Sequence, residues 1–142
     1  LTAPMAMNIV VPYDKIPITD DVCESCVLTV LLHNNNRIVY YEGDLKNDPP
    51  VKETGYAAGE IRNVLMQKMN SVKRIRGDAD QFVLIIKPSA ASHFKNFVDI
   101  TDEVTICQVK RYYIDELNEA DKRILLKTNK NKAKRTKEKR SL

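Results

Sequence analysis

Two cysteines with Cys-x-x-Cys spacing are the first residues of this chain that could do chemistry. Cys23 and Cys26 can close a local disulfide, and the same spacing can supply a thiol redox pair or half of a zinc site. A zinc site needs further ligands, but Cys107 stands alone and is expected inside or at the end of a helix. A redox pair is expected after a strand, whereas this pair precedes one. The pattern therefore favours incidental thiols or a local disulfide without function.

Other catalytic arrangements are not supported by the sequence. His33 and His93 fall in different predicted elements, one ending a strand and the other starting a helix. The acidic pairs Asp20-Asp21 and Asp78/Asp80 fall in predicted loops, where a turn role is favoured. The sequence contains no glycine-rich phosphate loop and no Gly-x-Ser-x-Gly motif. We therefore expect neither enzymatic activity nor a cofactor or metal site.

Two pairs of adjacent tyrosines lie on predicted strands. Tyr40-Tyr41 and Tyr112-Tyr113 each place one ring on either face of a sheet. An outward tyrosine can stack on a base, so an RNA-binding module is one alternative. The most apolar strand, however, lacks the alternating aromatic and basic residues of such a module. Ordinary strand tyrosines are the favoured interpretation.

Positive charge is concentrated at the C-terminal end. The net charge is +4, yet residues 127–142 carry eight Lys or Arg and one acid, which is +7. Residues 1–126 then carry 15 bases and 18 acids, which argues against a basic nucleic-acid-binding face on the folded body. A soluble polar end is the default, and binding to an anionic membrane, glycan or nucleic acid is the alternative. The candidate contacts are Lys130, Lys132, Lys134, Arg135, Lys137, Lys139 and Arg140.

One short apolar run organises the predicted fold. Residues 82–87 follow the turn signal of residues 77–80 and end at Pro88, which predicts a strand buried on both faces. A hairpin of residues 27–33 and 37–41 turns through three asparagines. A last strand is expected at residues 109–114, parallel to the central one through a right-handed crossover.

Two amphipathic segments and a short third helix complete the pattern. Residues 57–70 and 92–106 carry apolar side chains at helical spacing, with Ser92 as a plausible N-cap, and a polar loop is expected at residues 42–56. The order β-β-α-β-α-β predicts a small α+β two-layer sandwich, a mixed sheet with two helices on one face. The expected domains are an extended segment (1–26), a folded domain (27–117), and a short helix with a basic tail (118–142).

The N-terminal segment holds one strand-like pattern. Met7, Ile9 and Val11 alternate with other residues, and Pro12 ends the run. So short a strand needs a sheet edge, its own or another chain's. No window reaches the ~18 continuous apolar residues of a membrane span. Because the chain begins at Leu1, we expect a fragment or a processed product of a longer protein.

Taken together, the pattern resembles the periplasmic domain of the ExbD/TolR family of biopolymer transport proteins. The alternating segment ending in Pro12 is similar to the one that follows the family's membrane helix, with valine in place of leucine before the proline. The hairpin of residues 28–41, with Tyr40-Tyr41-Glu42-Gly43, resembles the family's first two strands, and residues 59–65 resemble the start of its first helix. The most specific likeness is the series of residues 84–89, 94–104 and 109–113.

This resemblance implies a subunit of a proton-driven inner-membrane motor. The family implies a homodimer on the periplasmic side of the inner membrane, anchored by one N-terminal helix absent from this chain. It also implies an ExbB-like channel subunit and a TonB-like protein as partners. The residues expected to bind a partner by strand addition are Met7, Ile9, Val11 and Pro12.

Two functions from different classes remain open. An ExbD-like subunit energises TonB-dependent outer-membrane transport through protein binding and dimerisation. A TolR-like module instead binds peptidoglycan, with the basic tail as a candidate contact. A nucleic-acid module is the least favoured, because it requires salt-sensitive binding by the body of the domain and not only by the tail.

Overall fold

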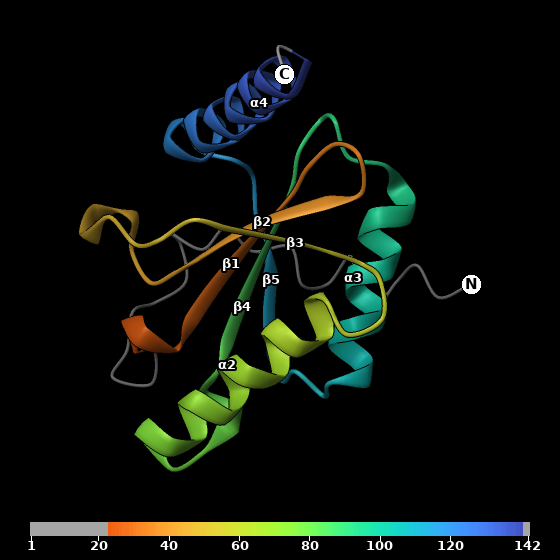
Figure 1. Ribbon diagram of the computed structural model, residues 1–142. Coiled ribbons are helices and arrows are strands. Elements are labelled where there is room, and N and C mark those ends of the chain that lie inside the picture. The colour runs from red at the N-terminus through yellow and green to blue at the C-terminus, as the bar shows by residue number, and fades with distance from the viewer. Residues whose placement is uncertain (1–22, 141–142) are drawn as a thin grey trace.

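The computed structural model describes residues 23–140, and within it a mixed five-stranded sheet forms the centre (Figure 1). The strand order is β3-β2-β1-β4-β5. This arrangement confirms the predicted small α+β fold with a mixed sheet. The strands are β1 Val27–Leu32, β2 Arg37–Glu42, β3 Lys52–Gly55, β4 Val83–Pro88 and β5 Arg111–Ile114.

The hairpin of β1 and β2 is confirmed. The two strands are antiparallel, with Val30 opposite Tyr40. Asn35 and Asn36 both have positive φ, at 55° and 56°, in a tight turn. Asparagine tolerates this left-handed backbone better than most residues, which explains the asparagines at these two positions of the turn.

The predicted central strand, β4, lies between two parallel neighbours. It pairs with β1 on one side and with β5 on the other. Residues Val83, Leu84, Ile85 and Ile86 are each at most 1% exposed. Alternate side chains point to opposite faces, so this strand is packed on both sides, as the continuous apolar run predicts.

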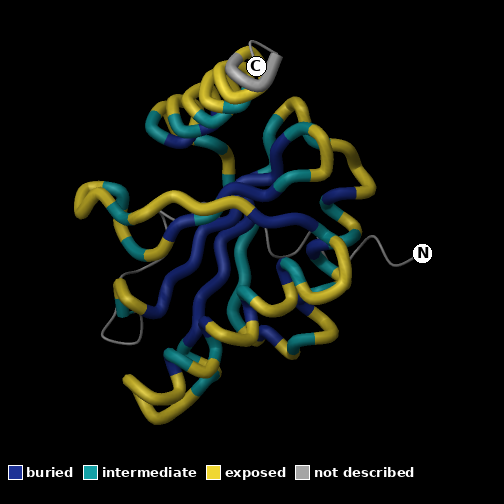
Figure 2. The backbone as a smooth tube through the Cα atoms, in the orientation of Figure 1, coloured by how far each residue is buried: buried dark blue, intermediate teal, exposed yellow. Residues whose placement is uncertain are grey.

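One face of the sheet carries α2 and α3, and this confirms the prediction of two helices on one face. The helices are α2 Ile61–Arg76 and α3 Phe94–Ile106. Leu65 of α2 and Ile100 of α3 join a core cluster with Leu28, Leu84 and Ile86 of the sheet. Figure 2 shows the buried residues concentrated on the strands and on the inner sides of these helices. This cluster is the main core.

The boundaries of α2 and α3 differ from those predicted. The first helix begins at Ile61 and continues past Asn70 to Arg76, where Gly77 ends it with φ 79°. In the second, His93 is the N-cap rather than Ser92. The backbone N–H of His93 donates to Asn96 Oδ1 at 2.8 Å, so a side chain three residues ahead supplies the cap.

A strand occupies part of the region expected to be a loop. β3 pairs antiparallel with β2, with Glu53 opposite Val39. Only two of its four residues, Thr54 and Gly55, are buried. The strand is short and begins with two exposed charged residues, so its sequence carries no apolar alternation from which to predict it.

The C-terminal region was predicted wrongly as a short helix with a low-complexity tail. Helix α4 spans Glu119–Arg140, a length of 22 residues. Asn118 and Asp121 cap its start reciprocally: Asp121 N–H donates to Asn118 Oδ1 at 2.8 Å, and Asn118 N–H donates to Asp121 Oδ2 at 3.1 Å. The residues that follow are mostly Lys, Arg and Leu without Gly or Pro, which favours continued helix.

The first turns of α4 pack on the second face of the sheet. Leu125 is 6% exposed and forms a cluster with Leu31, Val39 and Tyr41. A separate cluster on this face contains Val27, Val83 and Ile85, with Tyr113 packed against it. Thus α4 packs against the β1–β2 part of the second face, and the β4–β5 part has its own cluster.

Candidate functional site

The Cys-x-x-Cys pair is a disulfide in this structure. Cys23 and Cys26 are bonded across a 3-10 turn, Glu24–Cys26, with a Cα–Cα distance of 5.2 Å. Cys26 is 1% exposed and belongs to the main core. The bond therefore constrains the turn that leads directly into β1.

Cys107 is a free cysteine at the end of α3. Burial raises the pKa of its thiol, and the nearby Glu103 raises it further.

A buried lysine holds this turn against the sheet. Lys68 of α2 donates from Nζ to the backbone oxygen of Ser25 and to Glu42 Oε1, each at 2.6 Å. The Lys68 side chain is 8% exposed, whereas that of Glu42 is 55% exposed. No sequence motif marks Lys68, because a lysine at its position looks like a solvent-facing residue of an amphipathic helix.

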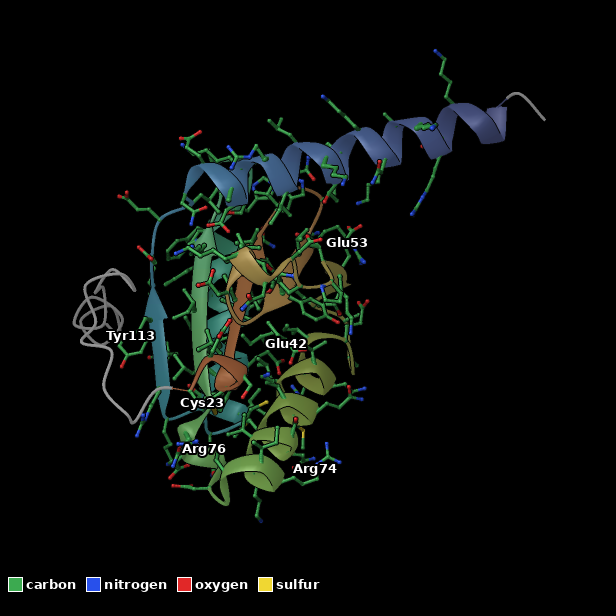
Figure 3. The ribbon with its side chains drawn as sticks, turned by 90° about the vertical axis from the view of Figure 1, so that its left-hand side faces the viewer. Cys23, Glu42, Glu53, Arg74, Arg76 and Tyr113 are labelled. Carbon is green, nitrogen blue, oxygen red and sulfur yellow. A yellow bond between two sulfur atoms is a disulfide. The ribbon has the colours of Figure 1, made fainter. Side chains whose placement is uncertain are left out.

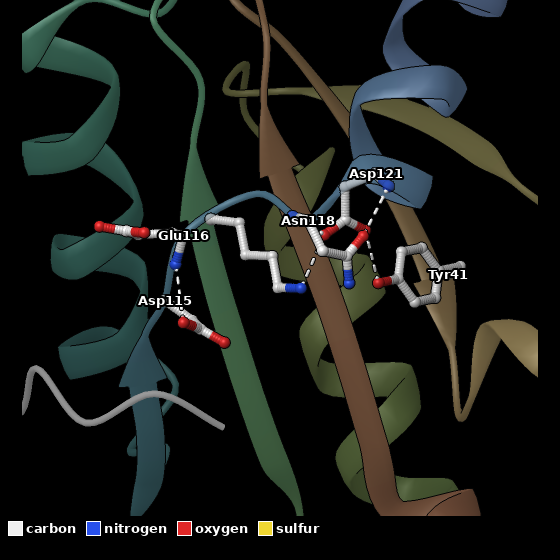
Figure 4. A network of polar contacts seen from close by, with 6 residues as sticks. Tyr41, Asp115, Glu116, Asn118 and Asp121 are labelled. Atoms are coloured by element: carbon white, nitrogen blue, oxygen red, sulfur yellow. Dashed lines mark hydrogen bonds and ion pairs between the residues drawn. The ribbon is translucent and has the colours of Figure 1, made fainter. Parts of the chain in front are cut away.

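A second buried polar cluster joins the sheet to α4. Lys87 Nζ of β4 lies 2.7 Å from Asp121 Oδ2, and Tyr41 OH of β2 donates to Asp121 Oδ1 at 2.8 Å. Asp121 is 0% exposed and Lys87 is 7% exposed. Figure 4 shows Asp121 at the start of α4, close to Asn118 and Tyr41. Both carboxylate oxygens are therefore hydrogen-bonded, as a buried charge requires.

Burial changes the chemistry of Tyr41 in this cluster. Burial first, and then the hydrogen bond to Asp121, raise the pKa of the Tyr41 hydroxyl above its usual value. The phenol therefore remains a proton donor to the carboxylate at neutral pH. No local sequence pattern marks this cluster, because Lys87 and Tyr41 are 34 and 80 residues distant from Asp121 in the chain. Only the fold brings them together.

The two histidines lie in different elements and have separate surroundings. His33 is 3% exposed at the end of β1, and its Nε2 lies 2.9 Å from Asn129 Oδ1 of α4. His93 caps α3. Asp78 accepts a hydrogen bond from Asp80 N–H at 2.9 Å, the turn role predicted for it. Asp20 and Asp21 lie outside the described residues.

The basic residues of the predicted tail lie on α4. Lys130, Lys134 and Arg135 are exposed, and Lys132 Nζ lies 3.6 Å from Glu53 Oε1 of β3. Lys137 is also on the exposed part of the helix, and the backbone continues helical through Lys139 and Arg140. Figure 3 shows the C-terminal half of α4 extending beyond the sheet. The cations are thus held on a rod about 33 Å long, at 1.5 Å per residue.

The two outer strands of the sheet differ in character. β3 pairs only with β2 among the described residues, and its Lys52 and Glu53 are exposed. β5 pairs only with β4 in the same part of the chain, and all four of its residues are half-buried. Charged residues on an edge discourage pairing with another strand, and β3 carries two of them whereas β5 carries only Arg111, at its start. The β5 edge is therefore the better candidate for strand addition.

The structure gives no position for the residues predicted to bind a partner by strand addition. Met7, Ile9, Val11 and Pro12 lie outside the described residues.

The tyrosine pairs divide between the two faces of the sheet, as predicted. Tyr40 and Tyr112 pack on the main core, and Tyr41 and Tyr113 pack on the opposite face. All four rings therefore contribute to packing on the sheet.

Residues 23–140 contain neither a metal-binding cluster nor a membrane-spanning helix. No group of three or more His, Cys, Asp or Glu side chains in this part of the chain could hold a metal ion. No helix there combines the length and the apolar composition needed to cross a bilayer.

The chain was compared with models of protein families, with curated proteins and with solved structures. None of the three comparisons found a match.

Proposed function

We propose that this chain is the periplasmic domain of an ExbD-like subunit of a proton-motive-force-driven inner-membrane motor. It acts by binding other proteins, through dimerisation and through addition of an extended strand at the edge of its sheet. Its partners are a second copy, an ExbB-like channel subunit and a TonB-like protein, and its place is the periplasmic side of the inner membrane. The sequence resemblance suggests this family, and the β5 edge supplies the observation that carries the mechanism.

The backbone of β5 presents hydrogen-bonding groups away from the sheet. Asp115 N–H donates to Ile86 O of β4 at 3.0 Å. Because alternate residues of a strand direct their N–H and C=O groups to the same side, those of Tyr113 also face β4. The groups of Tyr112 and Ile114 consequently face the outer edge. An added strand can pair with these two residues.

The alternating segment of residues 7–11 is a candidate for such a strand. It has the period-two pattern of a strand and ends at a proline, but it is too short to be stable without a partner sheet. Competition between this segment and a partner strand at β5 would couple the motor state to partner binding. We propose this exchange as the step that distinguishes an ExbD-like motor from a simple scaffold.

Backbone substitution at β5 tests the mechanism. Ile114→Pro removes one outward N–H, which an edge strand tolerates, while Ile114→Ala removes the same side chain and keeps the N–H. We expect Ile114→Pro to weaken binding of a TonB periplasmic segment clearly more than Ile114→Ala does. Equal binding by the two variants would show that the β5 edge is not used.

Deletion of residues 1–12 tests the role of the alternating segment. The shortened chain should differ from the full chain in dimerisation, measured by analytical ultracentrifugation, or in affinity for the TonB segment. A chain that is unchanged in both would exclude a role for residues 7–11.

The second candidate function is a TolR-like peptidoglycan-binding module. The observation that favours it is the exposed cationic length of α4, because peptidoglycan carries carboxylates that such a helix can attract. It predicts that the protein sediments with isolated peptidoglycan and that shortening the chain after Thr128 abolishes this. Binding to the TonB segment without sedimentation would favour the first proposal.

A further inference from the structure

A groove runs between α4 and the connection from β2 to β3. Its volume is about 540 Å³. One wall is the side of α4 that begins at Ala120, and the other is formed by the connection and the start of β3, including Leu45, Pro49 and Val51. Leu45 and Ile124 both pack against the cluster around Leu31, so the groove rests on the folded core.

The α4 wall carries a row of cations at regular spacing. Arg123, Lys127, Asn131 and Arg135 all line the groove and follow one another every four residues. Successive positions in such a row are about 6 Å apart along the helix axis. The row therefore presents three positive charges and one amide over about 18 Å.

These three cations have no acidic partner in the part of the chain described. Arg123, Lys127 and Arg135 form no ion pair with any of the described residues. The neighbouring Lys132, in contrast, pairs with Glu53. The same groove has an apolar side, made by Leu45, Pro49, Val51 and Ile124. Val51 is 45% exposed, so an apolar side chain is open to a ligand. Asp48 and Glu53 also line the groove, and Lys132 offsets Glu53, so the lining keeps a net positive charge. This charge and the apolar side together favour a ligand that is anionic and partly apolar.

We infer that this groove binds an acidic, extended segment of a partner protein, in which carboxylate and apolar side chains alternate. Side chains on one face of an extended chain recur about every 6.7 Å, close to the step of the cationic row. The carboxylates would then meet Arg123, Lys127 and Arg135, and the side chains between them would reach the apolar wall. This binding is separate from strand addition at β5.

Two other anionic partners fit the groove less well. A glycan site is commonly expected to offer an aromatic platform, but no aromatic residue lines this groove. A membrane surface is flat, and the exposed Lys130 and Lys134 that would meet it on α4 do not line the groove. An extended polypeptide can lie in the groove and place its carboxylates against the cationic wall and its apolar side chains against the apolar wall.

The test uses the full 142-residue chain and a fluorescein-labelled peptide of four Glu-Leu repeats. The triple variant Arg123→Gln, Lys127→Gln and Arg135→Gln removes the row. Its control, Lys122→Gln, Lys130→Gln and Lys134→Gln, removes the same charge from the same helix outside the groove. Fluorescence anisotropy should show binding weakened about tenfold or more by the first triple, if each ion pair contributes roughly 0.5 kcal/mol. The control should weaken it less than threefold.

Peptide variants test the two walls separately. A peptide of Gln-Leu repeats should lose most of the affinity, and octaglutamate should bind more weakly than Glu-Leu at equal salt because it lacks apolar contacts. Circular dichroism checks that both triple variants keep α4. Equal weakening by the two triples, or tighter binding of octaglutamate, would reduce the interaction to general charge attraction and overturn the inference.

Other occupants are distinguished by two further arms. Vesicles containing phosphatidylglycerol and isolated peptidoglycan are each offered to the same proteins. If either binds and depends on Arg123, Lys127 and Arg135 while the Glu-Leu peptide does not bind, the groove has a different ligand and the inference is wrong. If only the peptide depends on these three residues, the inference stands, whatever the outcome at β5.

Discussion

The ammonium of Lys87 and the carboxylate of Asp121 form a buried ion pair at 2.7 Å, and this contact connects the central sheet to α4. Their side chains are 8% and 0% exposed. Two charges placed this deeply each require their partner, because an unpaired buried charge costs several kcal/mol. The pair therefore determines where α4 can sit on the sheet.

Removing one partner of this pair should destabilise the protein strongly. We expect Asp121→Asn to lower the free energy of unfolding by about 3 kcal/mol, because it leaves the Lys87 ammonium buried without its counter-charge. Urea denaturation followed by circular dichroism measures this loss. Lys122→Ala, which removes an exposed pair with Glu119 at 3.5 Å, is the control on the same helix and should cost under about 0.5 kcal/mol.

The double variant Lys87→Met with Asp121→Leu refines this prediction. Replacing both charges by apolar side chains leaves no unpaired charge, so it should cost less than Asp121→Asn alone. A double variant that is less stable than the single one would indicate that the hydrogen bonds which Asp121 accepts from Tyr41 and from the N–H of Asn118 matter more than the ion pair.

Adjacent leucines of α4 test how the helix docks. Leu125 is 6% exposed and Leu126 is 60% exposed. Leu125→Ala should cost about 2–4 kcal/mol of unfolding free energy through lost burial and a cavity, and Leu126→Ala less than about 1 kcal/mol. Thermal and urea denaturation of the two variants give the comparison. Similar losses for both would mean that α4 does not dock by this face.

Tyr41 should make stability depend on alkaline pH. Burial and the hydrogen bond to Asp121 raise the pKa of its hydroxyl above the ordinary value of 10.0, so the folded protein holds this proton more tightly than the unfolded chain does. The resulting stabilisation is fully present below pH 10 and is lost as the pH rises above about 10. Tyr56, whose hydroxyl pKa burial and Asp99 also raise, adds to the same loss.

The variant Tyr41→Phe isolates the contribution of Tyr41 to this loss of stability at alkaline pH. The difference in unfolding free energy between wild type and Tyr41→Phe should shrink as the pH is raised from about 8 to about 11, because only the wild type loses the phenol proton on unfolding. A difference that stays constant across this range would contradict a raised pKa for Tyr41.

Reduction of the disulfide should have a measurable effect. Cys23 and Cys26 are three residues apart, and closing so short a loop contributes about 2 kcal/mol in the loop-entropy account. Dithiothreitol should therefore lower the urea midpoint, and the number of titratable thiols in the unfolded chain should rise from one to three. Cys23→Ser with Cys26→Ser should be insensitive to the reductant. Three reactive thiols before reduction would show that the bond is not formed.

The sequence predicts the sheet better than its surroundings. The apolar run of β4 and the asparagine turn between β1 and β2 carry local signals, burial on two faces and tolerance of positive φ, that need no tertiary context. β3 has no such signal, since two of its four residues are exposed and it depends on pairing with β2. The polar cluster of Lys87, Asp121 and Tyr41 is likewise set by the fold alone.

The error at the C-terminus has a physical cause. Its lysine-rich composition suggested a solvated tail, but Lys and Arg are good helix formers. The reciprocal cap of Asn118 and Asp121 starts the helix, and docking of Leu125 on the sheet stabilises its first turns. The helix propensity of the following Lys and Arg residues then extends α4 to Arg140. The groove beside α4 was not foreseen because it depends on this helix and on the connection that leads to β3.

Nuclear magnetic resonance can show directly whether a partner strand adds to β5. A labelled sample of this chain is titrated with a TonB periplasmic segment, and a second sample shortened after Thr128 is titrated in the same way. Strand addition in a transport motor predicts chemical-shift changes on β5, at Tyr112 to Ile114, and on residues 7–12, with and without the end of α4. An absence of shifts, together with sedimentation of the protein with peptidoglycan, would contradict it.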